Sequence, residues 1–133
     1  MRQARGVGYL DGGENYARGE VSELVFDRLV VLVKRAFIHW CGHHHCDLDP
    51  CGSHHPPPQM LYQGLVIPTY CDSDILVPAE KEIYIAPALI LHYIRGHNYL
   101  PPLPFLEAVL ACPDPRSPEY QASIDKICKS EHG

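Results

Sequence analysis

The sequence predicts an α+β fold in which a small antiparallel sheet packs against helices. Three observations lead to this prediction: a helical pattern in the first third of the chain, short strand patterns in the middle, and further helical patterns toward the C-terminus. Two or three short strands need a helix on one face to form a stable sheet. The chain has 133 residues, and domains commonly hold roughly 100–200 residues. We therefore expect residues 1–133 to form a single domain.

The N-terminal third contains the clearest helical pattern. Apolar side chains recur at spacings of three and four between Ser22 and His39, which places them on one helix face. Ser22 is suited to cap the first turn, and Gly42 is suited to follow the last. Before this helix, residues 6–10 are expected to form a short strand or an extended arm. We predict one long helix over 22–39 that is central to the core.

Three short strand patterns follow, at 61–67, 74–77 and 82–85. Pro68 and Pro78 bound the first two, because proline cannot donate to the hydrogen-bond ladder inside a sheet. The connection between the second and third patterns is short enough for a hairpin. These strands are therefore expected to pair in an antiparallel sheet.

The C-terminal third returns to helical patterns interrupted by prolines. Pro87 suits the first turn of a helix that continues to Arg95, and Gly96 is a suitable stop. A second helix is expected over 103–111. A third is expected to begin at Ser117, which is followed by a proline at the first helical position. The predicted sheet thus packs against one long N-terminal helix and two or three C-terminal helices.

Composition argues against several classes of protein. Hydrophobic residues make up 46% of the chain and charged residues 20%, which is unlike a disordered chain. The formal net charge of −5 argues against a nucleic-acid partner, because protein surfaces that bind nucleic acids are basic. The longest strongly apolar stretch, 29–33, is far shorter than the roughly 20 residues that span a bilayer. Residues 1–10 lack the apolar core of a signal peptide. We therefore expect a cytoplasmic protein without a membrane partner.

The most unusual segment is the loop at 41–58, which reads CGHHHCDLDPCGSHHPPP and has neither a helical nor a strand period. Cytoplasmic thiols are mostly reduced, so clustered cysteines there indicate metal ligands or reactive groups more than disulfides. Four residues separate Cys41 from Cys46, and four separate Cys46 from Cys51, which lets the loop fold back around one ion. Thiolate and imidazole together suit Zn²⁺, which binds both in a tetrahedron. The sequence therefore predicts a zinc-binding loop at 41–58.

A tetrahedral site requires a fourth ligand besides those of the loop. In our interpretation the loop supplies His44, Cys46 and Cys51, and the C-terminal part supplies His92. His92 lies on a helix that is otherwise almost entirely apolar, where a polar ring must find a partner. A single histidine in such a place can also be a core residue with an ordinary hydrogen bond.

Two residues remain alternatives to His92 for the fourth position. His97 follows the predicted helix stop at Gly96 and is expected at a more exposed place, and Cys41 belongs to the loop itself. The three cysteines outside the loop lie among apolar residues and are expected to be small core side chains. They are Cys71, Cys112 and Cys128.

Several of these residues belong to a longer pattern. The chain has G-Y-L near its N-terminus, then G-x-H-x-C with a further cysteine, then Y-x-A-P-x-L-I-x-H-Y-I-x-x-H-x-Y-x-P-P and F-x-x-A-V. With these motifs it resembles a family of short, uncharacterised bacterial proteins. The resemblance implies a shared fold and a loop ligand set of His44, Cys46 and Cys51, and it implies no activity. The matching residues after the N-terminal motif are Gly42, His44, Cys46, Cys51, Tyr84, Ala86, Pro87, Leu89, Ile90, His92, Tyr93, Ile94, His97, Tyr99, Pro101, Pro102, Phe105, Ala108 and Val109.

Three functions are compatible with such a site. The first is a structural zinc site in a small binding or accessory protein, which can have a protein partner. The second is a zinc-dependent hydrolase with an open coordination position, for which Asp47, Asp49 and Glu107 are nominal general bases. The third is a metal carrier or sensor, for which Ni²⁺ or copper would compete at the imidazoles. Because no H-E-x-x-H or G-x-S-x-G motif is present, the sequence favours the non-enzymatic interpretation.

Overall fold

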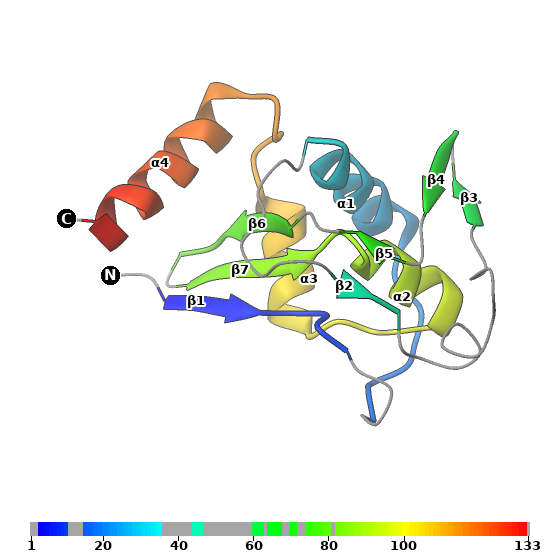
Figure 1. Ribbon diagram of the computed structural model, residues 1–133. Helices are drawn as coiled ribbons and strands as arrows, with labels where there is room; N and C mark the ends of the chain where they lie inside the picture. Colours follow the sequence, from blue (N-terminus) through cyan, green and yellow to red (C-terminus); the bar gives the residue numbers. More distant parts are fainter. Residues whose placement is uncertain are drawn as a thin grey trace.

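The computed structural model describes residues 3–10, 15–35, 44–46, 60–62, 64–67, 70–71, 74–80 and 82–132. It confirms the predicted α+β class (Figure 1). The elements in chain order are β1 (Gln3–Gly6), α1 (Glu23–Arg35), β2 (His44–His45), β3 (Met60–Tyr62), β4 (Leu65–Ile67), β5 (Tyr70–Cys71), β6 (Asp74–Pro78), β7 (Glu82–Pro87), α2 (Ile90–His97), α3 (Leu103–Ala111) and α4 (Pro118–His132).

The main sheet has three strands in the order β1-β7-β6 and is mixed. Strands β6 and β7 form the predicted antiparallel hairpin, with Asp74 opposite Pro87. Strand β1 lies parallel to β7, with Gln3 opposite Glu82, so the expectation of a wholly antiparallel sheet is wrong for this strand. A parallel pair requires a long crossover connection. The chain provides one, because it passes through α1 between the two strands.

Two segments differ locally from the prediction. The pattern at 61–67 forms two short antiparallel strands, β3 and β4, because Gly64 adopts a φ of +80° that reverses the chain. The loop expected to lack regular structure contains β2, which pairs with β5. This two-residue strand forms only by pairing with a segment distant in sequence, so no local period predicts it.

The main sheet separates two apolar clusters, because side chains alternate between its faces. Leu76 and Ile83 lie on one face, where Ile124 of α4 packs against them. The Tyr120 hydroxyl of α4 also donates to the Leu76 carbonyl at 2.6 Å. The opposite face contributes to the main core, together with α1, α2 and α3. The main-core residues of this face are Ile75, Val77, Tyr84 and Ala86.

Local signals place α1, α3 and α4 where the sequence predicts them. At the start of α1, Ser22 Oγ accepts the Val25 N–H at 3.3 Å. Residues 36–39 of the predicted helix lie outside the described residues. Helix α3 has the predicted bounds, and Ser117 Oγ accepts the Tyr120 N–H at 3.3 Å in the first turn of α4.

Helix α2 differs from its prediction at both ends. Pro87 is the last residue of β7, and Gly96 does not end the helix. Asn98 ends it instead by adopting a left-handed conformation with φ of 55°, which asparagine tolerates better than most residues. The Tyr93 carbonyl then accepts the N–H groups of Asn98 and Tyr99. As a result His97 lies inside the helix and is buried, which corrects the expectation that it is more exposed.

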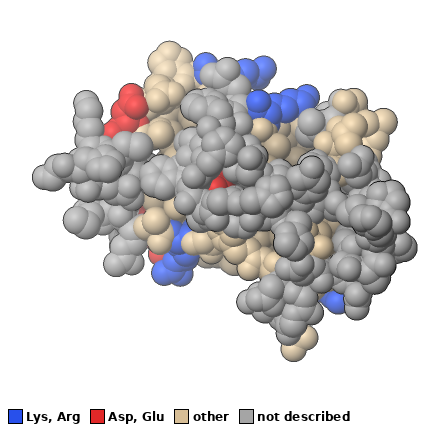
Figure 2. Space-filling model, viewed as in Figure 1, with Lys and Arg blue, Asp and Glu red and all other residues tan. Residues whose placement is uncertain are grey.

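Charged side chains link several elements at the surface. Arg95 of α2 donates to Glu23 of α1 at 2.6 Å, and the Tyr62 hydroxyl of β3 contacts Glu23 and Asp27. On the face shown in Figure 2, the described Lys and Arg side chains lie in several separate groups. None of the described helices is long and apolar enough to cross a membrane.

Gly8 allows the segment after β1 to approach α2 closely. Its φ is +83°, and a Cβ atom there would lie 3.1 Å from side-chain carbons of Ile90, which is fully buried. The Tyr93 hydroxyl donates to the Leu10 carbonyl at 3.3 Å, so the same segment also reaches the middle of α2. The N-terminal segment therefore packs on the helix that carries His92 and His97.

We expect Gly8→Ala to lower the free energy of unfolding by about 2–4 kcal/mol, because it adds a steric clash to the cost of a positive φ. Gly64→Ala is the matched control, since Gly64 has a similar φ of +80° with open space around it. The control is expected to lose only about 1–2 kcal/mol. Urea denaturation measures both, and equal losses would contradict the close packing of Gly8 on Ile90.

Candidate metal centre

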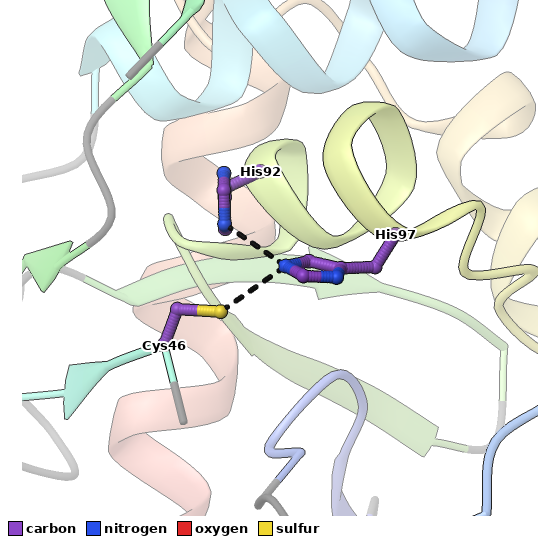
Figure 3. Close-up of side chains that lie close together, drawn as sticks. All are labelled: Cys46, His92 and His97. Atoms are coloured by element: carbon purple, nitrogen blue, oxygen red, sulfur yellow. Dashed lines mark hydrogen bonds between the residues drawn. The ribbon is translucent and has the colours of Figure 1, made fainter. Parts of the chain in front are cut away.

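Three side chains with metal-binding atoms converge beside α2 (Figure 3). Cys46 Sγ lies 3.3 Å from His97 Nε2, which lies 3.2 Å from His92 Nε2. One metal-binding atom of each residue lies within 4.8 Å of those of the other two. The exposed fractions of Cys46, His92 and His97 are 5%, 3% and 7%, so the cluster is buried. We refer to these three residues as the Cys–His cluster.

The two histidines come from one helix that apolar burial holds in place. Helix α2 buries Ile90, Leu91, Tyr93 and Ile94 in the main core, and His92 stands among them. His97 is the last residue of this helix, because the chain stays helical through Gly96. Side chains on a helix tilt toward its N-terminus. The ring of His97 thus reaches back toward His92, with the ring centroids 5.0 Å apart.

Cys46 reaches the cluster from a distant part of the sequence. It directly follows β2, whose residues His44 and His45 pair with Cys71 and Tyr70 of β5. This pairing aligns the backbone next to Cys46, and the side chain points from there toward the histidines of α2 (Figure 3). The cluster therefore joins the segment around β2 to α2.

The spacing of the donor atoms fits a tetrahedral zinc ion. Zn–N distances of about 2.0–2.1 Å and a Zn–S distance of about 2.3 Å place two nitrogen ligands about 3.3 Å apart and a sulfur and a nitrogen about 3.6 Å apart. The observed N···N distance is 3.2 Å and the S···N distance is 3.3 Å. Both distances from His97 are thus close to those around a zinc ion, and the donor atoms of Cys46 and His92 lie within 4.8 Å of each other.

Hydrogen bonds between the three side chains explain their arrangement less completely than a bound cation would. His97 Nε2 faces both Cys46 Sγ and His92 Nε2. A ring nitrogen has one lone pair or one hydrogen in the ring plane, so it forms one well-directed hydrogen bond. A cation between the three atoms would be bound by all of them at once.

Burial keeps both imidazoles in the neutral form that binds metals. It is the main cause that lowers the pKa of His92 to about 4, and the neighbouring His97 acts in the same direction. Burial also lowers the pKa of His97, with a further contribution from Arg18. At neutral pH the two rings therefore offer lone pairs without first losing a proton.

The structure brings together two of the four ligands in the predicted set, Cys46 and His92, and adds the alternative ligand His97. Of His44, only the backbone in β2 is described. Cys51 and Cys41 lie outside the described residues, as do Asp47 and Asp49. The remaining nominal base, Glu107, lies on α3.

The cysteines predicted to be core residues are described to different extents. Cys112 is buried in the main core, as expected. Burial raises the pKa of its thiol to about 11. Cys71 lies in β5 and Cys128 in α4, and the side chains of both lie outside the described part of the chain.

The fold and the site define a small α+β protein with a buried Cys–His cluster between two distant segments. Residues 1–110 match a family described as a domain of unknown function, DUF7919, and the chain belongs to this family. Comparison with curated proteins and with solved structures found no match. The family agrees with the expectation of an uncharacterised family, and its range among organisms stays a prediction.

The lowered pKa of His92 predicts a pH-dependent stability of the metal-free protein. An unfolded chain protonates this histidine near its usual pKa of 6.5, whereas the folded chain does so only near 4. The free energy of unfolding should therefore fall as the pH drops from 6.5 to 4, by on the order of 2–3 kcal/mol from this group. The contribution of this group to the pH dependence fades about one pH unit above 6.5, where the unfolded ring is also neutral. Urea denaturation at several pH values measures the slope.

The control for this measurement is His92→Gln, which removes the titrating ring. Its stability should fall less steeply over the same interval, since only the carboxylates and other histidines then contribute. Identical slopes for the two proteins would show that His92 is not held neutral by burial.

Proposed function

We propose that the protein is a metal-binding protein in which Cys46, His92 and His97 bind one Zn²⁺ as a structural site. The site would fasten β2 and the loop at 41–58 to α2. The observation that carries the proposal is the convergence of three buried donor atoms from two distant segments. His44, Cys51 and Cys41 are the candidates for the fourth ligand, and a cytoplasmic setting would keep the cysteines reduced.

The size of β2 supports a structural role. A two-residue strand paired with another two-residue strand is too short to be stable by itself. A metal that links Cys46 to α2 would close the long loop between them and contribute its binding energy to folding. The burial of all three donors also favours a closed site over a catalytic one, which must expose a coordination position to substrate and water.

The donor set supports zinc over harder cations. One thiolate and two imidazoles are ligands of zinc and of neighbouring transition metals, whereas Mg²⁺ and Ca²⁺ prefer oxygen. Zinc accepts this mixture in a tetrahedron without redox chemistry.

Protein purified without an affinity tag is expected to contain about one zinc ion per chain. Cys46→Ala and His97→Ala should lose it, because each removes one of three converging donors. Cys112→Ala is the matched control: it removes a buried cysteine outside the Cys–His cluster and should retain the metal. Elemental analysis gives the stoichiometry. Cobalt-substituted protein should show thiolate-to-metal charge-transfer absorption that Cys46→Ala lacks.

Retention of stoichiometric zinc in both Cys46→Ala and His97→Ala would place the metal elsewhere and refute the proposal. Several weakly bound ions per chain would instead favour the carrier or sensor interpretation.

The structural role predicts a large loss of stability on metal removal. Chelation should lower the free energy of unfolding by several kcal/mol or more, because the metal binds only the folded chain. Calorimetry of the metal-loaded and chelated protein measures this loss. X-ray absorption spectroscopy of the loaded protein should find four protein ligands. Three protein ligands plus a water, with stability unchanged after chelation, would favour the hydrolase interpretation instead.

A further inference from the structure

A half-open cavity of about 380 Å³ lies away from the Cys–His cluster, between α1 and the segment that joins α3 to α4. Cavities that bind small molecules measure roughly 300–1,000 Å³. This one is therefore large enough for a small organic ligand. None of the residues that line it belongs to the Cys–His cluster, so what it binds is independent of the proposed metal.

Most of the cavity wall is apolar. Val31 and Leu32 come from α1, Val109 from α3, and Pro113 and Pro115 from the connecting segment. Cys112 belongs to the same wall. Because burial raises its pKa to about 11, its thiol stays protonated at neutral pH and acts as an apolar surface.

The connecting segment forms a rigid part of the wall. The Asp114 carbonyl accepts the Ser117 N–H at 2.8 Å and the Ser117 hydroxyl at 2.6 Å. The Asp114 carboxylate accepts the Arg116 N–H at 2.8 Å. Prolines on both sides of Asp114 further limit the backbone. A ligand would thus meet a preformed surface and pay little ordering entropy.

Among the described residues that line this cavity, Arg28 is the cation available to a ligand. The Arg116 side chain donates to Asp114 through two nitrogens, at 3.1 and 3.0 Å, so this pair is internally neutral. Arg28 on α1 is exposed and lines the cavity, and it forms no ion pair within the part of the chain that the structure describes. It acts electrostatically on the Cys112 thiol, against the effect of burial, which places its charge close to the apolar wall.

We infer that this cavity binds a small monocarboxylate with a compact apolar body. The Arg28 guanidinium would donate hydrogen bonds to the two carboxylate oxygens, while Val31, Leu32 and Val109 contact the apolar part. A dianion such as phosphate is a poorer fit. Its second charge would require a second cation, and the other described cation of the lining, Arg116, is already paired with Asp114.

Octanoate is a suitable probe, because it combines one carboxylate with a flexible apolar chain. Titration of the metal-loaded full-length protein should shift the backbone NMR signals of residues 109–116 and of α1 around Arg28. Arg28→Met should weaken octanoate binding about tenfold or more by calorimetry, because it removes a charge-assisted hydrogen bond. Lys34→Met is the matched control: it removes an exposed charge from the same helix, away from the cavity, and should bind normally.

Two further measurements test the apolar part. Val31→Phe should abolish binding by filling the cavity, with an unchanged melting temperature, since Val31 is only partly buried. Neutral 1-octanol should bind more weakly than octanoate, and inorganic phosphate should not bind. The inference is overturned if octanoate does not bind, if Arg28→Met binds it as tightly as the natural protein, or if the shifted signals lie elsewhere, such as at the exposed Leu61 and Val66.

Discussion

The contact of Cys46 with His97 is the interaction on which the arrangement of this protein depends. It joins two residues 51 positions apart in the sequence, at a point where each is buried. Two imidazoles on an apolar helix are costly unless their polar atoms find partners. The segment that follows β2 provides such a partner, and the proposed metal would satisfy all three groups together. The same contact places β2, and with it β5, against the helical part of the molecule.

Local signals predicted much of the fold. Ser22, Ser117 and the apolar periodicity of α1 act over a few neighbouring residues, so they can be recognised without knowing the rest of the structure. The parallel position of β1 and the pairing of β2 with β5 depend on distant partners instead. No local period distinguishes them, because a two-residue strand has hardly any pattern.

In the candidate site, too, some residues could be predicted from local sequence signals and others could not. Composition indicated Cys46, and the polar ring on an apolar helix indicated His92. The expected helix stop at Gly96 makes His97 only an alternative to His92 in the sequence. Glycine is the usual helix terminator, so Gly96 concealed the role of Asn98. The spacing of five residues between His92 and His97 also differs from the three or four that align side chains on one helix face, so no helical period signals the pair. The side chains nevertheless meet, with their ring centroids 5.0 Å apart, because the His97 ring tilts back toward the helix N-terminus.

The parallel pairing of β1 with β7 also affects the order in which the sheet can fold. Gln3 and its partner Glu82 lie 79 positions apart in the sequence, with α1 between them. Until β7 has been made and folded against β6, the N-terminal strand has no edge on which to dock. Contacts of such long sequence separation slow folding, because a large loop must close before they form. We therefore expect the local β6–β7 hairpin to form first and to provide the edge on which β1 docks.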